Sequence, residues 1–155
     1  MEIQAFIFDL DGVLTDTSEF HYLGWQRLCD EFGIPFDRQK GENLRGVGRE
    51  DALRWILGDR AVTPEQFQEM MDRKNRYYLQ YVETVTPANL LPGSVELLNE
   101  IRSAGLKIAV ASASKNARRV IELLQIGSLL DAISDGHCAA RTKPSPDLFL
   151  HAAGQ

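Results

Sequence analysis

Two aspartates separated by one residue, Asp9 and Asp11, follow an apolar run near the start of the chain. The run, residues 3–8, is rich in Ile and Phe and predicts a buried strand. In an open α/β sheet, ligands bind at the C-terminal ends of the strands. Carboxylates this close together favour a cation such as Mg²⁺, beside which one can attack a phosphoryl group while the other transfers protons. The alternative is that Asp-Gly only makes a turn.

A second group of polar residues follows the apolar run 106–111, which predicts another strand. Ser112 comes first, and Ser114, Lys115 and Asn116 open a helix predicted over 114–125. A hydroxyl and a helix start in this position suit a bound phosphate. The alternative is an ordinary helix cap at Ser114 with a solvated Lys115.

Lys143 lies in a Thr-Lys-Pro-Ser-Pro run, after a short strand predicted at 131–134 and before another helix start. Taken alone, a lysine in such a loop is more often a surface residue than a functional one. Its position changes that reading, because three separate strand ends then supply Asp9 with Asp11, Ser112 and Lys143. A nucleophile, a hydroxyl and a cation at one sheet edge predict phosphoryl transfer.

The segment between the first strand and the rest is helical by pattern, with helices predicted at 18–32, 49–57 and 64–82. Lys74 falls on the apolar stripe of the third helix, where it either extends its ammonium to solvent at the stripe edge or aims a cation at a ligand. Arg49 begins a helix, a position where the dipole disfavours cations, and it is a second candidate for binding phosphate.

Composition narrows the classes of partner. The chain of 155 residues carries 17 Lys and Arg against 22 Asp and Glu, which gives a net charge of −5. This charge disfavours nonspecific binding of nucleic acid, which needs a basic surface. Cys29 and Cys138 form no zinc-type cluster and fit a reducing compartment. The opening apolar run is too short for a membrane span or a signal core, so we expect a cytoplasmic protein.

The order of elements predicts an α/β fold with a parallel sheet and a helical insertion. We expect the α/β part to be discontinuous in sequence, formed by residues 1–16 and 87–155. Residues 17–86 form the all-helical insertion between them.

The run Phe8-Asp9-Leu10-Asp11-Gly12 resembles the first motif of the haloacid dehalogenase superfamily of phosphotransferases. Ser112 resembles its second motif and Lys143 its third. Within the superfamily the sequence is similar to the β-phosphoglucomutase family, in the runs 15–17, 46–51, 73–75 and 111–117. The resemblance spans essentially the whole chain. It implies a parallel Rossmann-like haloacid dehalogenase core, incomplete here, with the helical insertion as its cap.

The resemblance also implies roles for individual residues. Asp9 is the nucleophile that carries the phosphoryl group, Asp11 the general acid/base, and Ser112 and Lys143 stabilise the group in transfer. Arg49 holds the phosphate that is not transferred, and His21 and Lys74 order Asp11. The substrate-binding set that it implies is Thr17, His21, Trp25, Gly46, Val47, Arg49, Lys74, Ser114, Lys115 and Asn116.

The activity that the resemblance implies is conversion of β-D-glucose 1-phosphate to glucose 6-phosphate through glucose 1,6-bisphosphate. A Mg²⁺-dependent sugar-phosphate phosphatase and an inactive fragment are the alternatives. Mg²⁺ is the implied cofactor, with Asp9 and Asp11 as ligands. We expect a small sugar phosphate as partner, with no nucleic acid and no membrane.

The superfamily places a fourth, acidic motif on a further strand, and the chain ends at Gln155 before such a motif. We therefore expect a truncated form, in which Ile3, Phe6, Ile7 and Phe8 lie on an unprotected apolar edge. The full-length family is expected to be monomeric, whereas this edge allows association.

Overall fold

The computed structural model describes residues 2–141 and 143–155. The chain divides into two compact units by its internal contacts. One, the α/β unit, comprises Met1–Asp16 and Val85–Gln155. The other, the helical unit, comprises Thr17–Thr84.

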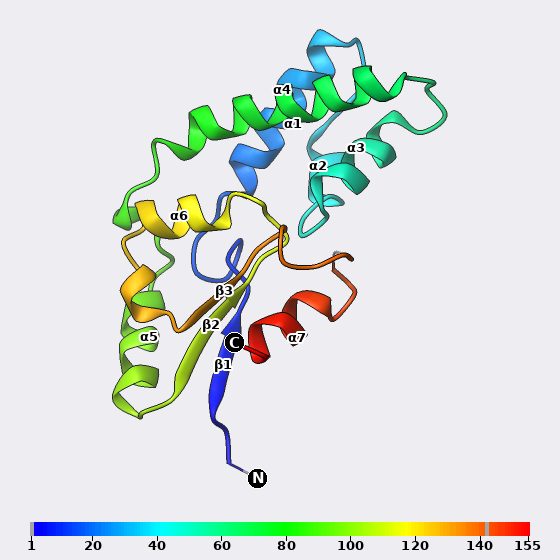
Figure 1. The fold of residues 1–155 in the computed structure, drawn as a ribbon. Helices are drawn as coiled ribbons and strands as arrows, with labels where there is room; N and C mark the ends of the chain where they lie inside the picture. Colours follow the sequence, from blue (N-terminus) through cyan, green and yellow to red (C-terminus); the bar gives the residue numbers. More distant parts are fainter. Residues whose placement is uncertain (1, 142) are drawn as a thin grey trace. The chain divides into compact units, whose positions relative to one another are not determined.

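Three strands form the sheet of the α/β unit (Figure 1): β1 (Ala5–Phe8), β2 (Lys107–Ala111) and β3 (Ala132–Ser134). They are ordered β1-β2-β3, and both neighbouring pairs are parallel. In the register, Phe8 lies beside Val110 and Ala111 beside Ser134. The C-terminal ends of all three strands therefore meet at one edge of the sheet, and the parallel α/β class expected from the sequence is confirmed.

The two faces of the sheet are separated by the alternation of side chains along β2. Ala109 and Ala111 pack in a cluster with Leu148 and Ala152 of α7 (Asp147–Ala153). The residues that alternate with these two alanines along β2, Ile108 and Val110, are fully buried on the opposite face. That face is covered by α5 (Ser94–Ser103), and α6 (Ala117–Leu123) lies on the same side in Figure 1. Helices on both faces are what a parallel sheet requires to bury its strands.

Within the described sheet, β1 has a neighbour on one side only. Ile3, just before it, is 67% exposed and Phe6 is 36% exposed, as expected for an apolar edge. The prediction is less accurate for Ile7 and Phe8, which are half-buried. Ile7 packs against the cluster beneath α7, and the Phe8 ring stacks on Phe6 with centroids 6.3 Å apart.

The helical unit contains α1 (Ser18–Glu31), α2 (Arg38–Glu42), α3 (Arg49–Leu57) and α4 (Pro64–Val82). The start of α4 is the one that its sequence predicts: Thr63 caps the helix, Pro64 occupies the first position, and Gln66 completes a capping box. α1 packs against α2 and α4, and α3 packs against α4. Their apolar core is formed by Trp25, Leu28, Cys29, Ile34, Leu44, Ala52, Leu53, Leu57 and Met70.

Two short elements differ from the prediction. The sequence pattern did not indicate α2, whose start is capped by Asp37 accepting the Lys40 amide. α6 begins at Ala117, so the helix predicted from Ser114 starts three residues later than expected. Two 3₁₀ turns, Pro87–Asn89 and Gly127–Leu129, complete the fold. None of the helices in the described part of the chain is long and apolar enough to cross a membrane.

Candidate active site

Asp9 directly follows β1 and forms the centre of the candidate site. One oxygen, Oδ1, accepts the backbone amide of Leu10 at 2.8 Å, which fixes the carboxylate at the strand end. The other oxygen, Oδ2, lies 2.7 Å from the Lys143 ammonium. The Asp9 side chain keeps 33% of its surface exposed, so the carboxylate is fixed and still accessible to a reactant.

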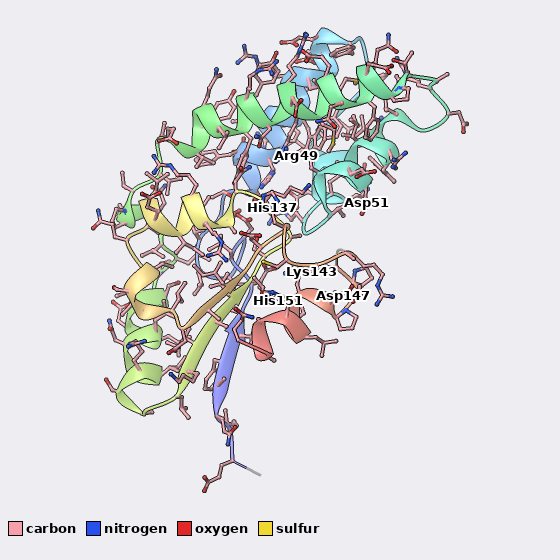
Figure 2. All side chains as sticks on the ribbon, viewed as in Figure 1. Arg49, Asp51, His137, Lys143, Asp147 and His151 are labelled. Atoms are coloured by element: carbon pink, nitrogen blue, oxygen red, sulfur yellow. The ribbon has the colours of Figure 1, made fainter. Side chains whose placement is uncertain are left out.

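Lys143 lies in the loop that leads from β3 to α7, where Figure 2 labels it. Its ammonium is 5.3 Å from the centre of the Phe149 ring, and its side chain is 18% exposed. An aromatic face on one side and a carboxylate on the other hold the cation at the strand ends. The first and third motifs thus meet in the α/β unit, 134 residues apart in sequence (143 − 9).

The turn after β1 places Asp11 near the same strand end. Gly12 adopts φ +80°, a left-handed conformation that a side chain disfavours, and its amide donates to the Thr15 carbonyl at 2.6 Å. Asp11 forms an isolated bridge with Thr15, whose hydroxyl donates to the Asn89 carbonyl at 2.8 Å. The Asp-Gly turn therefore forms, and it leaves both Asp9 and Asp11 near the C-terminal end of β1.

The loop after β2 is organised by serine side chains. The Ser112 hydroxyl accepts the Ser114 amide at 3.1 Å, and the Ser114 hydroxyl accepts the Asn116 amide at 3.2 Å. Because each hydroxyl uses an acceptor lone pair here, its O–H can still donate to a ligand. Ser114 does not cap α6, since the cap position is Asn116. Residues 112–116 form a loop at the C-terminal edge of the sheet, with the Lys115 side chain exposed.

Two residues that the sequence did not single out support this loop from the end of β3. The buried Asp135 accepts the Arg118 guanidinium at 2.9 Å and the His137 amide at 2.9 Å. Gly136 donates its amide to the Ser114 carbonyl at 3.2 Å. A Cβ on Gly136 would lie 2.5 Å from the Ala113 carbonyl oxygen and 3.0 Å from the Lys115 nitrogen. A glycine is therefore needed for the two loops to pack this closely.

We predict that Gly136→Ala lowers the free energy of unfolding by about 1–3 kcal/mol, because the added methyl overlaps rigid backbone. Urea unfolding measures this change. Gly127→Ala is the matched control in the same unit, since its Cβ would meet only the Ile121 side chain at 3.8 Å. An unfolding midpoint for Gly136→Ala equal to that of the unmodified protein would show that the loops are not closely packed.

In the helical unit, Lys74 is surrounded by other candidate residues. Its ammonium lies 2.9 Å from His21 Nδ1. It also lies over two aromatic rings, 4.9 Å from the centre of the Trp25 ring and 4.8 Å from that of Tyr78. Lys74 is only 2% exposed, so the prediction of a lysine reaching solvent from the stripe edge is wrong. The Tyr78 hydroxyl in turn lies 3.3 Å from the Thr17 hydroxyl.

His21 is neutral in this arrangement. Burial, together with the nearby charges of Lys74 and Arg49, lowers the pKa of the imidazole well below its usual value of 6.5. An ammonium can only donate, so Nδ1 accepts from Lys74 and the ring proton lies on Nε2. The ring also stacks on Tyr78 with centroids 4.0 Å apart. His21 therefore accepts a hydrogen bond from the Lys74 ammonium and, being neutral, does not repel it.

This lowered pKa predicts a loss of stability in acid. Below pH 6.5 the unfolded chain protonates His21 while the folded chain does not, so the free energy of unfolding falls as the pH drops toward the folded pKa. One proton is worth up to about 1.4 kcal/mol per pH unit. Thermal unfolding of the protein and of His21→Phe, which keeps a ring beside Tyr78, isolates the effect. Parallel pH profiles would contradict a neutral His21.

Arg49 and the loop before it form the last group of candidates. Gly46 and Val47 lie between α2 and α3, with Val47 packed on the apolar core of the helical unit. Arg49 opens α3 (Figure 2), and its Nη2 donates to Asn75 Oδ1 on α4 at 2.7 Å. Burial lowers the pKa of this guanidinium below its usual value. Lys74 and Asn75 are adjacent on α4, which therefore organises both cations.

The sequence matches the haloacid dehalogenase-like hydrolase family over residues 3–155. Since the match covers nearly the whole chain, this protein belongs to that family. The resemblance found in its first and later motifs is thereby confirmed.

Within the family, the chain is similar to the β-phosphoglucomutases. It is 43% identical over 155 residues to the β-phosphoglucomutase of Bacillus subtilis (strain 168), spanning 97% of this chain and 69% of the relative. It is 30% identical over 182 residues to that of Mycobacterium bovis, spanning 98% of this chain and 68% of the relative. The crystal structure of β-phosphoglucomutase from Clostridium difficile matches with a TM-score of 0.95 and 38% identity, over 99% of this chain and 70% of that one.

Proposed function

We propose that this protein is a phosphomutase that interconverts β-D-glucose 1-phosphate and glucose 6-phosphate. The observation that carries the proposal is the pair formed by Asp9 and Lys143, with 2.7 Å between carboxylate and ammonium at the C-terminal edge of a parallel sheet. An accessible carboxylate beside a cation is the arrangement that a phosphoryl-carrying aspartate needs. The similarity to β-phosphoglucomutases supports the choice of reaction.

In the first half of the cycle, Asp9 begins as an aspartyl phosphate. The 6-hydroxyl oxygen of β-D-glucose 1-phosphate attacks the phosphorus, and the bond from phosphorus to the Asp9 oxygen breaks. Asp11 accepts the hydroxyl proton as general base. The products are glucose 1,6-bisphosphate and the free Asp9 carboxylate.

In the second half, the bisphosphate binds in the opposite orientation. An Asp9 oxygen attacks the phosphorus at position 1, and the bond from that phosphorus to the sugar oxygen breaks. Asp11 returns its proton to the departing oxygen as general acid. Glucose 6-phosphate leaves, and the aspartyl phosphate is restored.

The phosphoryl group carries negative charge on its oxygens throughout both steps, and the residues around Asp9 provide the compensation. Lys143 supplies a full positive charge, and Ser112 supplies a hydroxyl donor. Ser114, Lys115 and Asn116 follow in the same loop, and we assign them to substrate binding. Because the loop is fixed by its own serine hydrogen bonds, its donors need little reorganisation during transfer.

We assign the phosphate that is not transferred to Arg49. A guanidinium binds phosphate in a bidentate manner, and only one of its N–H groups is used by Asn75. Lys74 and His21 position Asp11 in this proposal. The remaining substrate-binding residues that we propose are Thr17, Trp25, Gly46 and Val47.

The family implies a divalent cation, and we propose Mg²⁺. Asp9 and Asp11 offer the oxygen donors that a hard cation prefers. In this proposal the Asp9 carboxylate and the backbone carbonyl of Asp11 would hold the cation, which leaves the Asp11 carboxylate for proton transfer. When bound there, the cation would neutralise charge on the phosphoryl oxygens.

A small sugar phosphate is the partner that this chemistry requires. The exclusion of nucleic acid and membrane, the cytoplasmic location and the oligomeric state stay predictions from the sequence. Analytical ultracentrifugation over a range of concentrations would detect association through the exposed β1 edge.

The function is tested by following two products in one reaction. The protein is incubated with β-D-glucose 1-phosphate, Mg²⁺ and a trace of glucose 1,6-bisphosphate, and glucose 6-phosphate and free phosphate are measured together. We expect glucose 6-phosphate without release of phosphate. Release of phosphate alone would show that the protein is a phosphatase. If the protein is folded and forms neither product, this chain has neither activity.

A further inference from the structure

Asn75 is placed to control the candidate phosphate-binding arginine. It lies on α4, and its Oδ1 accepts Arg49 Nη2 at 2.7 Å, the shortest distance expected for such a bond. Arg49 and Asn75 are both partly buried. The bond therefore joins the first residue of α3 to the middle of α4 and fixes the rotation of the guanidinium.

The chemistry of the acceptor matters as much as its position. Among residues 2–141 and 143–155, no carboxylate forms an ion pair with Arg49. The other arginines of α3 and α4 differ in this respect: Arg54 pairs with Glu50 at 2.7 Å, and both Arg73 and Arg76 pair with Glu69, at 2.8 and 3.4 Å. A neutral amide orients Arg49 without forming an ion pair with it, and the carboxylate of Asp72 acts on the guanidinium only through its field.

An oriented guanidinium without an ion-pair partner at a helix start is not explained by the stability of the fold. The N-terminal end of a helix carries partial positive charge and disfavours a cation. Burial adds a further cost, which is expressed in the lowered pKa of Arg49. Such a group gains from an anion that binds to it.

We propose that Asn75 is a positioning residue that holds Arg49 ready for the phosphate of the sugar without neutralising it. The inference rests on the function proposed above and adds a residue to its site. Asn75 acts through Arg49, so its contribution disappears when Arg49 is removed.

Three variants separate this role from a structural one. Asn75→Ala removes the acceptor. Asn75→Asp keeps the shape and an oxygen acceptor but adds a negative charge beside Arg49. Gln80→Ala is the matched control, because Gln80 is also an amide on α4 that accepts an arginine, Arg27, at 3.1 Å. A merely structural hydrogen bond is kept in Asn75→Asp, whereas a positioning amide is not replaced by a carboxylate.

The experiment measures the affinity for β-D-glucose 1-phosphate by isothermal titration in full-length Asp9→Asn protein with Mg²⁺. This background blocks turnover, so binding is read separately from catalysis. We expect Asn75→Ala to weaken binding about tenfold and Asn75→Asp at least as much, with Gln80→Ala unchanged. In an Arg49→Ala background, Asn75→Ala should have no further effect.

Binding of Asn75→Asp at the affinity of its parent would overturn the proposal and leave a structural hydrogen bond. An effect of Asn75→Ala that persists without Arg49 would overturn it as well. If the Asp9→Asn protein binds no sugar phosphate, this inference and the proposed function fail together. If it binds normally but the unmodified protein forms no glucose 6-phosphate, only the proposed function fails.

Discussion

Asp9→Asn is expected to abolish formation of glucose 6-phosphate, with a loss in kcat of at least about 10³-fold. The amide lacks the negative charge that attacks phosphorus, yet its oxygen can still accept the Leu10 amide that fixes Asp9 at the end of β1. The variant should therefore fold normally and fail in chemistry. The coupled assay of glucose 6-phosphate measures the loss.

Asp9→Glu is the companion variant. It retains the charge but moves the oxygens by one methylene, away from the position that the Leu10 amide and Lys143 define. We expect an equally large loss, since a displaced nucleophile no longer aligns with the phosphoryl group. Thermal unfolding of both variants should match that of the unmodified protein. Turnover within tenfold of normal in Asp9→Asn would remove Asp9 from its role as nucleophile.

Lys143→Ala is expected to lower kcat by about 10²–10³-fold. The substitution removes the positive charge that lies 2.7 Å from Asp9 and that compensates the phosphoryl oxygens during transfer. Stability should change little, because a partly exposed ion pair contributes up to about 1 kcal/mol. Initial rates at saturating substrate give the change in kcat directly.

Lys107→Ala is the control for this variant. Lys107 also forms an ion pair in the α/β unit, with Asp131 at 2.9 Å, but it lies at the N-terminal end of β2. We expect its activity to be unchanged within about twofold. Equal losses in the two variants would mean that the charge of Lys143 matters for folding rather than for transfer.

Much of the α/β part of the site was predictable, because it depends on a simple topological rule. Parallel strands end at the same edge, so Asp9, Ser112 and Lys143 could be grouped once three strands were recognised. The start of α4 was equally predictable, since Thr63, Pro64 and Gln66 act within one turn of helix. Local signals of this kind do not depend on the rest of the fold.

One error concerns a local contact, whereas another arises because the deciding contacts are distant in sequence. Ser114 has the chemistry of a helix cap, but its hydroxyl instead accepts the Asn116 amide within the loop. Lys74 is buried because His21, Trp25 and Tyr78 surround its ammonium, which the pattern of a single helix cannot show.

The residues that the sequence analysis missed, Gly136 and Asn75, have no feature in the sequence that marks them individually as important. Gly136 matters because its backbone packs against Ala113 and Lys115 from another loop. Asn75 matters because of Arg49, 26 residues away. The sequence signal that could have drawn attention to Asn75 is its place beside Lys74, inside a run that resembles the β-phosphoglucomutase family.

The central claim is that Asp9 carries the phosphoryl group, and trapping that group tests it most directly. The protein is mixed with glucose 1,6-bisphosphate and Mg²⁺ and quenched, and borohydride then reduces any aspartyl phosphate to homoserine. Peptide mass spectrometry locates the reduced residue. We predict homoserine in place of Asp9, with Asp11 unmodified. A modified Asp11, or an unmodified Asp9 in protein that forms glucose 6-phosphate, would contradict the account.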